Sequence, residues 1–144
     1  MEVRSLALKQ AVQLPAGQYG TLPAANQLDA LQRGSATVFT AVGYGLQRIN
    51  PVFIEAEKIR MSAEPHLIQI NTPGFTGDFS LLLSNNAATG GTCFGDSGGP
   101  NYLGSSNVIA GVTSFGLNGN CAGTGGVFRL DRQNVLDFVT QYLK

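Results

Sequence analysis

The sequence predicts an all-β domain that ends in a single α-helix. Three observations lead to this prediction. Short apolar, β-branched segments recur along the chain, and glycine, proline, asparagine and aspartate separate them. Helical spacing of apolar residues is convincing in one place only, at the C-terminus. The chain of 144 residues contains 19 glycines, and 12% of its residues are charged. Many short strands followed by a helix are typical of an antiparallel barrel or sandwich.

Several segments are expected to form β-strands. Segment 36–43, with the sequence ATVFTAVG, is β-branched and aromatic and predicts the clearest strand. The segment 13–29 carries Pro15, Gly17, Gly20 and Pro23 and predicts an irregular connector. The other expected strands are 3–8, 52–61 (a weaker candidate), 66–71, 79–83, 107–115 and 126–130.

The C-terminal segment predicts the helix. Its apolar residues recur at helical spacing at positions 135, 136, 138, 139, 142 and 143. Asp131 is a suitable N-cap, and Lys144 suits the negative end of the helix dipole.

Composition excludes several classes of protein. The 9 basic and 9 acidic residues give a net charge of zero, and the sequence has no cluster of lysines and arginines. Both observations argue against a nucleic-acid partner. No apolar run approaches the roughly 18 residues of a membrane span. One histidine and two cysteines argue against a metal site, and no motif calls for a cofactor. The chain starts without a signal peptide, but its few charges and Gly-rich loops suggest an extracellular or periplasmic protein.

The segment 90–100, GGTCFGDSGGP, carries the chemistry. A serine between glycines, Ser97, exposes its hydroxyl, and the backbone N–H groups of Gly95 and Ser97 can point at one oxygen as in an oxyanion hole. The alternative is a Gly-rich loop with an incidental serine. The Gly-x-Ser-x-Gly pattern also matches α/β-hydrolases, but their histidine follows the serine, whereas His66 precedes Ser97.

This segment, with the GDSGGP motif, resembles the nucleophile loop of the trypsin/chymotrypsin-like serine proteases, and it is most similar to bacterial members. Val112-Thr113-Ser114-Phe115-Gly116 resembles the strand that pairs with substrate, and Gly126-Val127-Phe128 the back wall of the specificity pocket. The start Val42-Gly43-Tyr44-Gly45 and the final helix also match. The resemblance implies a single six-stranded Greek-key barrel with a C-terminal helix, which is the second half of the family's two-barrel fold.

The resemblance also divides the chain. Residues 1–12 would be a strand left from the missing first barrel, 13–34 a connector, and 35–144 the barrel domain with its helix. In the family, the first barrel supplies the triad histidine and aspartate; Glu2 aligns with that aspartate, and the histidine has no counterpart. The face left by the missing barrel should be apolar, so we expect a homodimer or higher oligomer.

The resemblance implies roles for several residues. Ser97 would be the nucleophile and Gly95 an oxyanion donor, while Asp96 would orient the loop by pairing with an arginine or lysine or else leave it partly disordered. Cys93 and Cys121 would form a disulfide. Gly91 at the base and Gly116 and Gly126 on the walls would leave an open pocket for a sizeable apolar group. Thr92, Ser114 and Phe115 complete the expected pocket.

Two questions stay open from sequence. His66 is either a turn histidine or a substitute base, acting within the chain or across a dimer interface. The chain is expected to be a serine hydrolase that cleaves small esters better than peptides, because amides need a protonated leaving group. The alternatives are a protease half that needs another domain for its histidine, and an inactive binding module that keeps the pocket.

Overall fold

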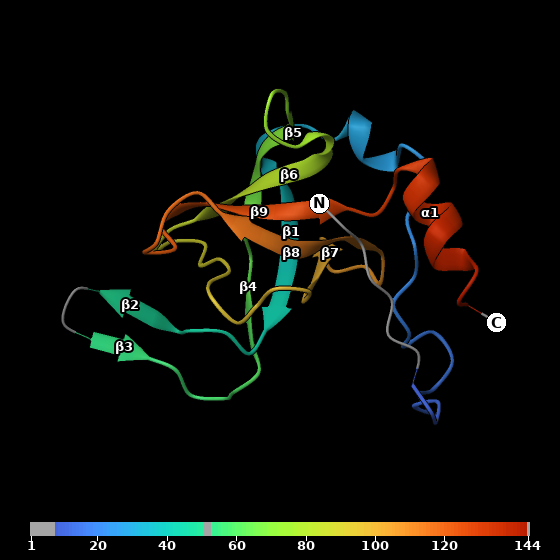
Figure 1. Ribbon diagram of the computed structural model, residues 1–144, viewed down its shortest axis with the longest axis horizontal. Coiled ribbons are helices and arrows are strands. Elements are labelled where there is room, and N and C mark those ends of the chain that lie inside the picture. The colour runs from blue at the N-terminus through green and yellow to red at the C-terminus, as the bar shows by residue number, and fades with distance from the viewer. Residues whose placement is uncertain (1–7, 51–52, 144) are drawn as a thin grey trace.

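Six antiparallel strands close into a barrel in the computed structural model, which describes residues 8–50 and 53–143 (Figure 1). Neighbours around the barrel are β1, β5, β6, β9, β8 and β7, and β7 pairs back onto β1. The predicted six-stranded barrel with a C-terminal helix is confirmed. The barrel strands are β1 (Gly34–Gly43), β5 (His66–Thr72), β6 (Gly77–Asn85), β7 (Pro100–Leu103), β8 (Ile109–Gly116) and β9 (Gly123–Arg129).

The segment predicted as a strand over 52–61 is described from residue 53 onward, and this part forms none of the six barrel strands. Part of it forms β3 (Phe53–Glu55), which pairs only with β2 (Arg48–Asn50). This hairpin projects from the barrel on the side away from the helix (Figure 1). The next strand, β4 (Met61–Ala63), pairs with the end of β1. The sixth barrel strand is instead β7, which the sequence did not predict because it is short and begins with a proline.

The barrel interior is filled from every side by aliphatic and aromatic side chains. Alternate residues of the strands point inward, and β1, β5, β6, β8 and β9 each place a fully buried side chain in the core, whereas β7 contributes partly buried Leu103. The fully buried core consists of Leu28, Phe39, Leu67, Leu81, Leu83, Ala110 and Val127. Leu28 belongs to η1 (Gln27–Ala30), a 3₁₀ turn in the predicted connector, so this connector covers one end of the barrel.

The C-terminal helix α1 (Gln133–Thr140) packs outside the barrel, where Val135 joins Phe128 and Leu130 in a second apolar cluster. Asp131 is not its N-cap, contrary to the sequence prediction; Arg132 precedes the first turn. The carboxylate of Asp131 is fully buried and accepts hydrogen bonds from Arg129 Nε and Nη2, so it is unavailable to the helix. Within the described chain, no helix has the length and apolar character to cross a bilayer.

A buried ionic network ties the connector to the end of β9. Arg129, with no exposed surface, also donates 2.8 Å hydrogen bonds to Asn71 and Asp29, and Asp131 accepts another from the N–H of Leu28. Burial by itself lowers the pKa of Arg129, but its hydrogen bonds to Asp131 and Asp29 outweigh burial and raise this pKa. The network fixes the connector although the connector has little regular structure of its own.

Two sequence predictions cannot be compared with the structure. Most of the strand predicted over 3–8, and Glu2, lie outside the described residues. Residues 8–12 form no strand.

Candidate active site

Ser97 lies in the long loop that joins β6 to β7. The disulfide between Cys93 and Cys121, whose Cα atoms are 5.3 Å apart, ties this loop to the segment before β9. The predicted disulfide is therefore present. It holds the chain four residues before Ser97 against the opposite wall of the site.

Backbone hydrogen bonds fix the other side of the loop. The N–H of Gly98 donates to the carbonyl of Thr113 over 2.8 Å, and the N–H of Thr113 donates to the carbonyl of Gly99 over 2.9 Å. Gly95 and Gly98 have φ angles of 98° and 84°, a region that residues with a Cβ rarely adopt. The two glycines let the chain turn sharply on each side of Ser97, which leaves that serine exposed.

Asp96 has a different partner from the one expected. Its Oδ1 accepts a 2.7 Å hydrogen bond from the N–H of Gly45, and its Oδ2 accepts a 2.8 Å bond from the N–H of Cys93. The half-buried carboxylate makes no ion pair with a described residue. Two backbone donors replace the predicted arginine or lysine because the carboxylate lies directly against the backbone after β1. A Cβ at Gly43 would overlap Asp96 Oδ1.

The amides around Ser97 are open to a ligand. Among the described residues, neither the N–H of Gly95 nor that of Ser97 has an acceptor, and the Ser97 hydroxyl has no hydrogen-bond partner. Both amides belong to exposed residues. Two unpaired N–H groups beside an exposed hydroxyl are what an acyl-transfer site offers to a developing oxyanion.

A cavity of about 120 Å³ adjoins Ser97. Its walls include Ser114, and no described residue that lines it carries a charge. Most of the side chains that line the cavity are neutral polar or aromatic: Asn85, Thr92, Thr113, Ser114, Asn118, Thr124, Phe94 and Phe115. The lining favours a small uncharged group.

The pocket differs from the predicted one at two glycines. Thr92, Ser114, Phe115 and Gly116 line the cavity as expected, but Gly91 and Gly126 do not. Phe115 pairs across the sheet with Gly126, and its ring lies against that glycine, where a Cβ would overlap it. Gly91 is covered in the same way by the side chain of Asn85. Side chains occupy the space that these two glycines leave, so neither glycine opens the cavity beside Ser97 as the sequence had suggested.

His66 lies at the start of β5 and is not among the residues that line the Ser97 cavity. Its Nδ1 is 3.4 Å from the Oγ of Ser84, and its backbone N–H donates to the same oxygen. Ser84 Oγ also shares a 2.8 Å hydrogen bond with Thr89 Oγ1. The described chain thus engages the imidazole in a polar cluster at the β5–β6 pair and brings no histidine to Ser97.

Sequence reasoning missed a buried polar pair behind the nucleophile loop. Asn101, on β7, has no exposed surface, and its Nδ2 donates a 3.0 Å hydrogen bond to Thr113 Oγ1. Asn101 Oδ1 has no partner among the described residues. The alternation of β7 signals that residue 101 points inward, but only the closed barrel places it beneath the loop.

Comparisons with known proteins agree with this geometry. The model of the trypsin family matches residues 11–138. A mutant of human heparin binding protein (CAP37) has a TM-score of 0.62 at 20% identity, over 85% of this chain and 48% of that protein. HL collagenase has a TM-score of 0.62 at 22% identity, over 85% and 52%. A scabies mite inactivated protease paralogue has a TM-score of 0.59 at 12% identity, over 86% and 52%.

A search of curated proteins found no match. The chain spans about half the length of the solved structures it matches. At these identities the structural likeness shows the fold alone, whereas the family match covers most of the chain and includes the loop around Ser97. The chain belongs to the trypsin family of serine proteases.

Proposed function

We propose that the chain is a serine hydrolase in which Ser97 attacks small esters, with the N–H groups of Gly95 and Ser97 stabilising the oxyanion. The observation that carries this proposal is the pair of amides without acceptors beside an exposed, unpaired hydroxyl. Asp96 supports the pair by holding its loop against Gly45 and Cys93.

The proposed preference for esters follows from the absence of a base. No histidine or carboxylate lines the described Ser97 cavity. A serine hydroxyl is a weak nucleophile without a neighbouring base. Attack on an activated ester still proceeds because its leaving group departs as an anion, whereas a peptide nitrogen must first be protonated. Hydrolysis of p-nitrophenyl acetate should therefore be slow but measurable, and peptide cleavage much slower.

A fluorophosphonate probe and p-nitrophenyl acetate together test the proposal. The probe should label the wild-type chain and fail to label Ser97→Ala. Ser105→Ala, which removes an exposed hydroxyl in the β7–β8 turn, is the matched control and should be labelled like the wild type. Absence of labelling in the wild type would overturn the proposal and leave two alternatives, an inactive binding module and a protease half that needs another domain. One structural relative is itself described as an inactivated protease paralogue.

A second candidate function is a protease half that obtains its base from another domain. The observation in its favour is that the chain spans about half of the structures it resembles. Under this proposal, Ser97 reacts only when a first-barrel domain carrying the histidine is added. Activity restored by that addition, and absent before it, would support this candidate over the first.

We also propose that the protein self-associates and that it is located outside the cytoplasm. We expect the chain to self-associate through the face that packs on a first barrel in the two-barrel fold, which would give a dimer or larger species in light scattering at micromolar concentration. A clean monomer would contradict this expectation. An extracellular or periplasmic location would be seen by fractionation of the source cells.

A further inference from the structure

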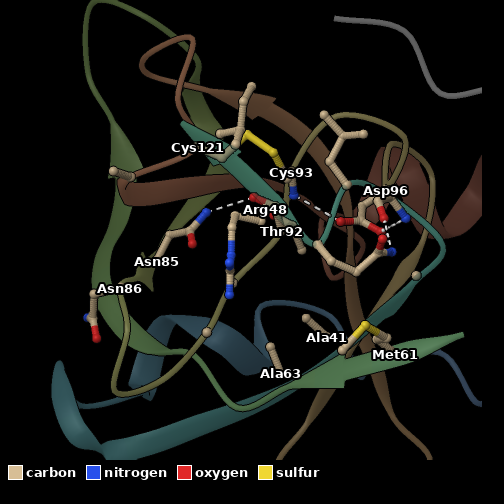
Figure 2. A pocket seen from close by; sticks show the side chains of 18 of the residues that line it. Ala41, Arg48, Met61, Ala63, Asn85, Asn86, Thr92, Cys93, Asp96 and Cys121 are labelled. Atoms are coloured by element: carbon tan, nitrogen blue, oxygen red, sulfur yellow. Dashed lines mark hydrogen bonds between the residues drawn. A yellow bond between two sulfur atoms is a disulfide. The ribbon is translucent and has the colours of Figure 1, made fainter. Parts of the chain in front are cut away.

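Asn85, the last residue of β6, stands between two cavities. One is the cavity of about 120 Å³ beside Ser97. The other is a larger hollow of about 530 Å³, which lies between the end of β1, β4 and the segment 85–93 (Figure 2). Four residues line both, so they form the partition: Asn85, Thr92, Cys93 and Cys121.

Asn85 supplies the removable part of this partition. Cys93 and Cys121 are joined covalently and cannot swing aside. The amide of Asn85 is clamped, because its Nδ2 donates a 2.7 Å hydrogen bond to the carbonyl of Thr92. Figure 2 shows this bond, with the amide nitrogen directed at Thr92. The Asn85 side chain also packs against Gly91, where a Cβ would overlap Asn85 Cγ.

The Ser97 cavity is small, so the residues that close its inner end limit the length of the group that it can hold. An apolar cavity of about 150 Å³ holds a benzene molecule. At about 120 Å³ the Ser97 cavity is smaller than that, whereas the hollow behind the partition is several times larger. A substrate group that passes Ser97 therefore stops at the partition after a few heavy atoms.

We propose that Asn85 is a specificity-determining residue: its side chain forms the floor of the Ser97 cavity and restricts it to short, uncharged groups. The inference rests on the proposed function of Ser97 and names the substrate class for that site. Removal of the amide joins the cavity to the hollow, so longer acyl chains gain a place to bind. Discrimination by a single methylene in a pocket is worth roughly 10–200-fold.

The test compares kcat/KM for p-nitrophenyl acetate and p-nitrophenyl octanoate. The wild type should prefer acetate by at least about 10-fold. Asn85→Ala should shift the octanoate-to-acetate ratio by at least about 10-fold toward octanoate. Met61→Ala is the matched control, because half-exposed Met61 lines the hollow but not the Ser97 cavity, and it should keep the wild-type ratio. An unchanged ratio in Asn85→Ala, or a wild type without preference, would overturn the inference.

A binding measurement separates this inference from the proposed function. In the Ser97→Ala background, acetamide and octanamide are titrated while the backbone amide shifts of Thr92 and Thr124 are followed. Octanamide should bind only when Asn85→Ala is also present. If no variant hydrolyses esters, the proposed function fails, but this arm still decides the inference. Thermal unfolding checks that Asn85→Ala folds; if it does not, Asn85→Ser, which keeps a hydroxyl near Thr92, takes its place with the same expected shift.

Discussion

The carboxylate of Asp96 and the backbone N–H of Gly45 are joined by a 2.7 Å hydrogen bond across 51 residues of sequence. This bond connects the nucleophile loop to the chain that leaves β1. The second oxygen of Asp96 binds the N–H of Cys93 within the same loop. The position of Ser97 thus depends on a contact that requires glycine on one side and a carboxylate on the other.

Gly43→Ala should weaken that contact. The new Cβ would overlap Asp96 Oδ1 and push the carboxylate away from Gly45. Loss of a hydrogen bond to a charged group costs roughly 1.5–3 kcal/mol. We expect a lower melting temperature and a rate of fluorophosphonate labelling that falls about 10-fold or more. Gly119→Ala, where a Cβ meets open space, is the control and should behave like the wild type. Equal labelling of both variants would contradict this role of Gly43.

Asp96→Asn should remove the charge and one hydrogen-bond acceptor while leaving the size of the side chain nearly unchanged. The amide is nearly isosteric with the carboxylate, but its NH₂ must face one of the two backbone donors, Gly45 or Cys93. One hydrogen bond is lost, and two donors oppose each other at a half-buried position. Denaturant unfolding should show a loss of roughly 1.5–3 kcal/mol, together with slower labelling of Ser97. Wild-type stability and reactivity in this variant would show that the two bonds do not hold the loop.

Removal of the disulfide should both destabilise the fold and loosen the site. For a separation of 28 residues, the loop-entropy model gives roughly 3–4 kcal/mol for the Cys93–Cys121 bridge. The double variant Cys93→Ser/Cys121→Ser should show this loss in the free energy of unfolding. Labelling of Ser97 should slow as well, because the disulfide ties the first part of the nucleophile loop to the segment before β9. A double variant with unchanged stability would count against this account.

Acid should remove part of the stability that the connector receives from Asp29. The hydrogen bond from Arg129 is the main cause that lowers the pKa of Asp29 below its ordinary value of 3.8. A lowered pKa stabilises the fold above the ordinary value, and this stabilisation disappears as the pH falls through the lowered value. The difference in melting temperature between wild type and Asp29→Asn should be constant above about pH 5 and shrink at lower pH. A difference in melting temperature that stays the same at low pH would contradict this account.

His66→Ala should leave the reaction of Ser97 unchanged. Its ring contacts Ser84 and does not line the Ser97 cavity, so its removal takes no group from the site. Ester hydrolysis by wild type and variant, compared at equal protein concentration, checks this expectation. A loss of activity that grows with dilution of the wild type would instead point to His66 supplied by a second copy of the chain.

Much of this protein was predictable from local sequence. Strands such as β1 and β8 were found because β-branched and apolar residues fit a pleated, half-buried surface. The helix followed from apolar spacing. The loop around Ser97 was found because glycines at 95 and 98 permit backbone angles that few other residues adopt. Each of these features depends on residues close together in the chain.

The tertiary structure decided what depends on distant residues. The sixth barrel strand is β7 and not the segment predicted over 52–61, because β7 pairs with both β1 and β8 and so closes the barrel. This long-range pairing outweighs the local strand propensity of the predicted segment. The tertiary structure gave Asp96 two backbone donors, and it turned Asp131 from a helix cap into a buried partner of Arg129. It also filled the pocket at Gly91 and Gly126 with Asn85 and Phe115. A glycine in the sequence marks space for a close neighbour, but only the folded chain determines which side chain takes that space.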